Sequence, residues 1–92
     1  MPKPTKQMLF LLDCICSQAH SHKEMHKLLQ ILLSPSELKD LQDRIGILNG
    51  LSEGQTQRNI AKQQNVSISK VIRGAAVYRN MKKTIDQLLA KT

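Results

Sequence analysis

The stretch 57–74, QRNIAKQQNVSISKVIRG, constrains the fold of this chain more than any other. Its first half predicts a short helix over about Gln57–Gln64, with Ile60 and the small Ala61 facing inward so that a second helix can cross closely. Asn65 follows, and asparagine tolerates the left-handed backbone conformation that a tight turn requires. The pattern therefore predicts a helix that ends at a turn and leads directly into another helix.

The second helix of this pair begins just after Val66, where Ser67 is a suitable N-terminal cap. Val71 would face inward, and the outer face would carry Ser69, Lys70, Ile72 and Arg73. The helix-turn-helix would span about residues 56–79. A helix pair joined by a short turn is the usual device for placing one helix in the major groove of DNA, although two ordinary packed helices would give the same pattern.

The composition favours an all-α fold. Phe10 and Tyr78 are the only aromatic residues, so the core has to be built from aliphatic side chains and methionine. Three prolines and four glycines are few, and the apolar residues show no sustained alternation of the kind expected for strands. A chain of 92 residues forms one domain at most, and a helical domain of this size often depends on a partner subunit.

Positive charge is concentrated in the C-terminal part of the chain. The net charge is +7, with +2 on residues 1–33, −2 on residues 34–54 and +7 on residues 55–92. In the last segment eight Lys and Arg stand against Asp86 alone. This distribution is expected for contact with nucleic-acid phosphates, because a generally basic surface would not leave the middle segment acidic.

The clearest helix start is SPSE at residues 34–37, with a serine cap, a proline in the first helical position and a glutamate that can complete a capping box. This helix would run to about Glu53 and end at Gly54. Gly46 and Gly50 lie inside it and predict that another helix approaches closely. Its predicted core stripe is Leu38, Leu41, Ile45, Leu48 and Leu51.

Residues 1–5 are expected to form a flexible arm, and residues 6–92 a single helical domain. Further helices are predicted over about Lys6–Ala19, Lys23–Leu33 and Met81–Ala90, which brings the total to about six. The first of these has an apolar face wider than one intramolecular neighbour needs, so it predicts a dimer interface. The second is apolar nearly all round and is expected to be buried on most sides.

Several classes of protein and site are not expected. Cys14 and Cys16 are two residues apart, which suits neither a disulfide nor a zinc hook, and His22 and His26 lack a third metal ligand. No signal peptide or membrane-spanning stretch is apparent, so the cytoplasm is the expected location. An enzyme is the least expected class, because no paired carboxylates, activated nucleophile or phosphate-binding loop occur.

In combination, the SPSE start, Arg44 ten residues after Ser34 and the ISKVIRG ending of the helix pair resemble the tryptophan repressor family. The match is best from about Ile31 to Arg79, and the terminal helices agree in order and approximate length. The resemblance implies an all-α homodimer whose six helices per chain intertwine with a second copy. It also implies a repressor of tryptophan biosynthesis or uptake genes, with L-tryptophan as corepressor and a palindromic double-stranded DNA operator.

The resemblance implies that Arg44 and Arg73 clamp the indole ring, since guanidinium planes stack well on an aromatic face. Arg73 would also meet the carboxylate of the ligand. The other ligand-binding residues it implies are Gly74 and Val77, and from the second subunit Ile31, Leu33 and Ser34.

For DNA, the resemblance implies backbone and base-edge contacts from Gln57 and Arg58 and a phosphate contact from Arg79. The second helix of the pair, which we call the reading helix, would contribute Ile68, Ser69, Lys70, Ile72 and Arg73.

Two departures from the family favour a ligand-independent helix-turn-helix regulator as the alternative. Val77 stands where the family has a serine that helps to hold the carboxylate, and the loop from Gly54 to Gln57 is one residue shorter. A third hypothesis, from a different class, is a basic helical module that binds an acidic partner protein.

Overall fold

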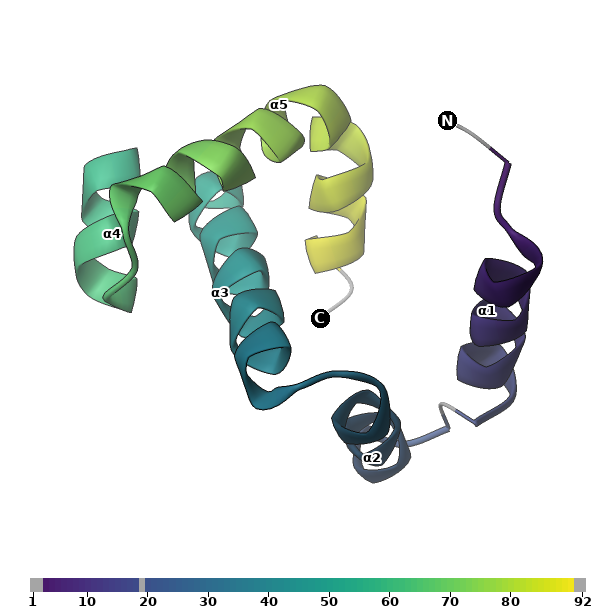
Figure 1. Ribbon diagram of the computed structural model, residues 1–92. Helices are drawn as coiled ribbons and strands as arrows, with labels where there is room; N and C mark the ends of the chain where they lie inside the picture. The colour runs from purple at the N-terminus through teal and green to yellow at the C-terminus, as the bar shows by residue number, and fades with distance from the viewer. Residues whose placement is uncertain (1–2, 19, 91–92) are drawn as a thin grey trace. The chain divides into compact units, whose positions relative to one another are not determined.

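The structure is a computed structural model that describes residues 3–18 and 20–90, and no strand occurs in these ranges (Figure 1). Its elements are α1 (Lys6–Gln18), α2 (His22–Leu32), α3 (Pro35–Ser52), α4 (Gln57–Gln64) and α5 (Ile68–Ala90). The prediction of an all-α fold is confirmed. Three expected boundaries lie outside the described residues: the start of the arm at residues 1–2, the helix end at Ala19 and the domain end at residues 91–92.

The chain divides into two compact units, and the first extends to Leu38. In it, α1 packs beside α2. The Thr5 hydroxyl caps α1 by accepting a hydrogen bond from the Met8 amide at 3.0 Å, and Ser21 caps α2 in the same way.

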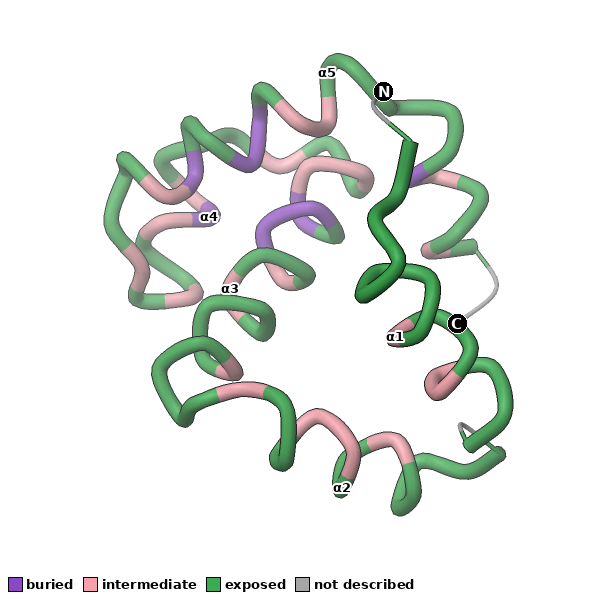
Figure 2. Tube along the Cα trace, turned by 45° about the vertical axis from the view of Figure 1, so that its right-hand side comes forward, coloured by how far each residue is buried: buried purple, intermediate pink, exposed green. Residues whose placement is uncertain are grey.

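Neither α1 nor α2 contains a buried residue, and Figure 2 shows buried positions only in α3, α4 and α5. The expectation that α2 is buried on most sides is therefore wrong for the single chain. Two short helices cannot enclose each other, so their apolar faces stay open. Large apolar side chains that remain exposed in this unit are Met8, Leu9, Phe10, Leu12, Ile31 and Leu32.

The helix start predicted at SPSE is confirmed. The Ser34 hydroxyl accepts a hydrogen bond from the Glu37 amide at 3.2 Å, and the Glu37 carboxylate accepts one from the Ser34 amide at 2.8 Å. These two bonds form the reciprocal capping box and fix the first turn of α3. At the other end, Gly54 has a φ of 82°, the left-handed conformation for which glycine was expected after the helix.

The second unit contains the predicted helix pair, and its boundaries agree with the sequence. The Thr56 hydroxyl caps α4, and Asn65 ends it with φ 53° and ψ 49°, in the left-handed region. The Ser67 hydroxyl then accepts a hydrogen bond from the Lys70 amide at 3.2 Å and caps α5. The turn chemistry inferred for Asn65 and Ser67 is therefore confirmed.

The core of this unit takes one fully buried residue from each helix: Ile47 of α3, Ile60 of α4 and Val71 of α5. Leu51, Ala61 and Val66 pack against them. Ile60 and Val71 were predicted to face inward, whereas Ile47 lay outside the predicted core stripe.

Two members of the predicted stripe, Leu41 and Ile45, are instead 49% and 46% exposed. The reason is that α3 is apolar on two faces. The elements α4 and α5 cover the face that carries Ile47, and Leu41 and Ile45 are left largely uncovered in the single chain. Further along the predicted stripe, Leu48 is buried and Leu51 packs against the core, as expected.

The glycines of α3 lie where α4 comes close, as the sequence predicted. A Cβ atom at Gly50 would stand 2.9 Å from Ile60 Cγ1, and one at Gly46 would stand 2.5 Å from Gln64 Oε1. Gln64 also donates a hydrogen bond from Nε2 to the Gly46 carbonyl oxygen at 2.8 Å. A side chain at Gly50 would meet Ile60 and push α4 away from α3, whereas one at Gly46 would meet the flexible end of Gln64.

The predicted final helix is the last part of α5, which bends at Met81, where φ is −130° and ψ is 30°. After the bend, the C-terminal turns come back alongside α3 (Figure 1). Ser52 of α3 donates a hydrogen bond to Asp86 Oδ1 at 2.8 Å, which ties the two helices together.

Candidate functional site

Most side chains of the helix pair that were expected to contact DNA are exposed. Gln57 and Arg58 lie in the first turn of α4, and both are exposed. The α5 residues expected to contact DNA are also exposed, with one exception, and comprise Ile68, Ser69, Ile72, Arg73 and Arg79. The structure therefore leaves these side chains accessible for a nucleic-acid contact.

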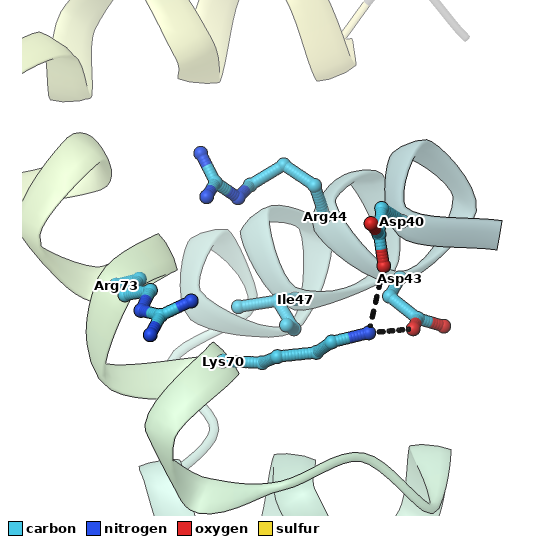
Figure 3. A pocket seen from close by; sticks show the side chains of 6 residues that line it. All are labelled: Asp40, Asp43, Arg44, Ile47, Lys70 and Arg73. Atoms are coloured by element: carbon cyan, nitrogen blue, oxygen red, sulfur yellow. Dashed lines mark hydrogen bonds and ion pairs between the residues drawn. The ribbon is translucent and has the colours of Figure 1, made fainter. Parts of the chain in front are cut away.

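Lys70 is the exception. Its ammonium lies 3.0 Å from Asp40 Oδ1 and 2.9 Å from Asp43 Oδ2, so its side chain crosses from α5 to α3 (Figure 3). Asp43 has a second partner in Lys39, whose Nζ lies 2.7 Å from its other oxygen. The two bridges of Lys70 join residues 30 and 27 positions apart, and no local pattern indicated them.

Arg44 of α3 and Arg73 of α5 line the same cavity, which has a volume of about 170 Å³ (Figure 3). The structure thus brings together the two arginines expected to form a clamp. The full lining is Asp40, Asp43, Arg44, Ile47, Lys70 and Arg73. Within residues 3–18 and 20–90, neither guanidinium forms an ion pair, so both are available to an anionic group.

The other residues expected to bind a ligand do not line this cavity. Gly74 is buried, and a Cβ atom there would stand 2.6 Å from Ile47 Cγ2, so its position permits close packing of α5 on α3. Val77 is half-buried one turn further along α5. Ile31, Leu33 and Ser34 were expected to act from a second subunit, and their contact with a ligand stays a prediction.

The Asp43 carboxylate beside the arginines is favoured in its charged form. Hydrogen bonds from Lys39 and Lys70 lower the pKa of Asp43 below its ordinary value of 3.8. Conversely, hydrogen bonds to Asp43 and Asp40 raise the pKa of Lys70 above 10.5. At neutral pH the cavity therefore combines two carboxylates already bridged by an ammonium with two unpaired guanidinium groups.

This arrangement suits a flat ligand that carries a carboxylate. Guanidinium groups bind carboxylates through paired hydrogen bonds and stack on aromatic rings, and the buried Ile47 gives the cavity an apolar floor. Pockets that enclose a whole small molecule are usually about 300 Å³ or larger, so this cavity would cover only part of such a ligand.

In the described part of the chain, no three or more His, Cys, Asp or Glu residues gather where they could hold a metal ion. None of the described helices is long and apolar enough to cross a membrane.

The family model and the relatives that match this chain point to the same family. The family model described as Trp repressor protein matches residues 6–92. A Trp operon repressor homolog of Chlamydia trachomatis serovar D is 35% identical over 78 residues, covering 84% of this chain and 83% of the relative. One from Xylella fastidiosa strain M23 is 39% identical over 72 residues, covering 77% and 78%. No solved structure matches the chain significantly.

Proposed function

This chain belongs to the Trp repressor protein family, and we propose that it binds a palindromic DNA operator as a homodimer with L-tryptophan as its corepressor. Membership makes it a Trp-repressor-like regulator, a DNA-binding protein of a family that is regulatory and not enzymatic. The operator would be reached in the cytoplasm, and the regulated genes would be those of tryptophan biosynthesis or uptake.

The observation that carries the ligand proposal is the pair of unpaired guanidinium groups in one cavity. Arg44 comes from the long helix and Arg73 from the reading helix, so a ligand held between them would connect the two elements. Arg73 also lies one residue after the exposed Ile72, in the middle of the face expected to meet DNA. Ligand binding at Arg73 would therefore directly affect the DNA-binding surface.

The apolar surface that the single chain leaves open supports the homodimer. Phe10 is 70% exposed and Ile31 80% exposed, and neither α1 nor α2 buries any residue. An open apolar hollow of about 450 Å³ lies beside Ile45 and the end of α5. Exposed apolar patches of this kind, present in each of the two units, are typical of interaction surfaces, and a second copy of the chain would cover them.

A second copy would also complete the ligand site. The cavity of about 170 Å³ covers only part of a ligand, and Ile31, Leu33 and Ser34 of the partner subunit are the residues proposed to close it. Backbone carbonyl groups of that segment would accept hydrogen bonds from the ammonium group of the amino acid. DNA contacts are proposed for Gln57, Arg58, Arg79 and the exposed residues of the reading helix.

The test is calorimetric titration of the purified protein with L-tryptophan, with D-tryptophan and indole-3-propionate as comparisons. We expect saturable binding of one ligand per subunit, abolished by Arg44→Ala. Arg58→Ala is the matched control, because it removes an exposed arginine outside the cavity. Absence of binding by the wild-type protein, with DNA binding intact, would contradict the corepressor proposal.

That outcome would favour a ligand-independent regulator of the same family. The observation that favours this alternative is that Val77 stands where the family has a serine. A valine cannot donate the hydrogen bond that a serine hydroxyl gives to a carboxylate, a loss of about 1.5–3 kcal/mol with a charged acceptor. The variant Val77→Ser should then gain affinity for L-tryptophan. A basic module that binds an acidic protein would instead show no preference for palindromic DNA over other duplexes.

A further inference from the structure

The pairing of Asp40 is unusual for its position on α3. Asp40 and Arg44 are four residues apart on one helix, the spacing at which an acidic and a basic side chain commonly pair. Asp40 nevertheless pairs with Lys70 of α5, thirty residues away, at 3.0 Å. Among the residues that the structure describes, the local partner, Arg44, pairs with no carboxylate.

Asp43 adds a second carboxylate to the same place. Its side chain is only 10% exposed, so it requires cationic partners, because a nearly buried charge is costly without them. Lys70 provides one at 2.9 Å, and Lys39 provides the other at 2.7 Å. Lys70 is therefore the one cation of this cluster that bridges both carboxylates and also lines the cavity.

From this arrangement we infer that Lys70 is a positioning residue that keeps Arg44 and Arg73 free by occupying the carboxylates of Asp40 and Asp43. Without Lys70, the Asp40 carboxylate would turn to Arg44, its neighbour one helical turn away. An arginine paired in this way would have to break that pair before it could bind the carboxylate of a ligand. Asp43 would remain bound to Lys39, so it would compete less with the ligand for Arg44 and Arg73.

This inference rests on the proposed ligand site, and it gives Lys70 a role different from the DNA contact implied by family resemblance. The charge of a lysine that bridges two carboxylates is already compensated by them, so the ammonium offers little attraction to a phosphate. The role also explains why the cavity can contain two carboxylates and still suit an anionic group.

The test measures L-tryptophan affinity by calorimetry for three variants. Lys70→Gln should weaken binding about tenfold, the cost of one competing charged hydrogen bond. Adding Asp40→Asn to Lys70→Gln should restore affinity to within about threefold of wild type, since the competing carboxylate is then gone. The matched control is Lys39→Gln, which removes the same charge from the same cluster outside the cavity and should leave affinity unchanged.

Wild-type affinity in Lys70→Gln, or no recovery in the double variant, would overturn the inference. Thermal unfolding of each variant confirms that the helices remain folded.

A second measurement does not depend on ligand or DNA. In the free protein, the Nε–H signal of Arg44 in NMR spectra should exchange more slowly with water in Lys70→Gln than in wild type, because Asp40 then accepts its hydrogen bond. The exchange should return to the wild-type rate when Asp40→Asn is added. If the wild-type protein binds no L-tryptophan, the corepressor proposal fails, and the NMR signal alone decides the role of Lys70. An exchange rate that is the same in Lys70→Gln and in wild type would refute that role.

Discussion

The hydroxyl of Tyr78 donates a hydrogen bond to Oδ1 of Asp86 at 2.8 Å, from one side of the bend in α5 to the other. Ser52 donates to the same oxygen from α3, and Lys82 pairs with the second oxygen at 2.8 Å. The Lys82 ammonium also lies 5.8 Å from the centre of the Tyr78 ring. One carboxylate thus fixes the angle of the bend and attaches the end of α5 to α3.

The first prediction concerns pH and Asp86. Hydrogen bonds from Lys82, Tyr78 and Ser52 lower the pKa of Asp86 from 3.8 to about 2. The stabilisation it provides is therefore complete above about pH 4 and is lost as the pH falls towards 2. In urea unfolding, Asp86→Asn should have a lower midpoint than wild type at pH 6, and the difference should shrink below pH 4.

Lys83→Gln is the control for this series, because Lys83 is exposed in the same part of α5 and no partner of Asp86 is changed. A difference between wild type and Asp86→Asn that stays constant from pH 6 to pH 2 would show that the Asp86 charge contributes no stability.

The second prediction compares two glycines. Gly74→Ala would place a Cβ atom 2.6 Å from Cγ2 of the fully buried Ile47, a β-branched side chain whose stiff χ1 limits how far this methyl group can turn away. We expect it to lower the free energy of unfolding by about 1 kcal/mol or more, despite the better helix propensity of alanine. Gly46→Ala meets only the flexible end of Gln64 and should stay within about 1 kcal/mol of wild type.

Chemical denaturation of both variants measures this contrast. Combining Gly74→Ala with Ile47→Ala, which removes the opposing methyl group, should destabilise less than the sum of the two single changes. Equal effects of Gly74→Ala and Gly46→Ala would mean that the contact between Gly74 and Ile47 is not close.

Much of the local structure could be predicted from the sequence, because it depends on neighbours in the chain. The capping box at Ser34, the left-handed Asn65 and the Ser67 cap each involve residues within a few positions of one another. Inward-facing Ile60 and Val71 followed from helical periodicity.

Features that depend on distant residues were not predicted. Apolar periodicity predicted the buried Leu48 of α3, but it did not show that α4 and α5 would cover Ile47 and leave Leu41 and Ile45 exposed. The bridge from Lys70 to Asp40 and Asp43 joins residues about thirty positions apart, and a lysine on an amphipathic helix has no pattern that indicates such a partner. The two clamp arginines followed only from family resemblance.

The third prediction concerns self-association. Leu12 lies on the uncovered apolar face of α1 and is 43% exposed, so Leu12→Asp costs the single chain little and should weaken the proposed dimer. Sedimentation equilibrium should show a lower average mass than for wild type at equal concentration. Gln63→Asp, which places the same charge on an exposed position of α4 instead of α1, should leave the mass unchanged. A monomeric wild-type protein would contradict the proposed homodimer.

The fourth prediction separates two arginines of α5. Arg73 lines the cavity and is exposed on the reading helix, whereas Arg79 is exposed six residues further along and does not line the cavity. We therefore expect Arg73→Ala to lose affinity for both L-tryptophan and operator DNA. Arg79→Ala should retain ligand affinity, lose operator affinity and reduce the slope of log K against log salt by about 1, as expected for one phosphate contact.

Calorimetry with L-tryptophan and fluorescence anisotropy with a labelled palindromic duplex at several salt concentrations measure both properties. Loss of L-tryptophan binding in Arg73→Ala with normal operator affinity would mean that the cavity and the DNA-binding face act independently. Normal ligand binding with lost operator affinity would instead limit Arg73 to DNA contact. Only the combined loss fits a single guanidinium that connects the ligand site to the reading helix, because the same side chain then contributes to both equilibria.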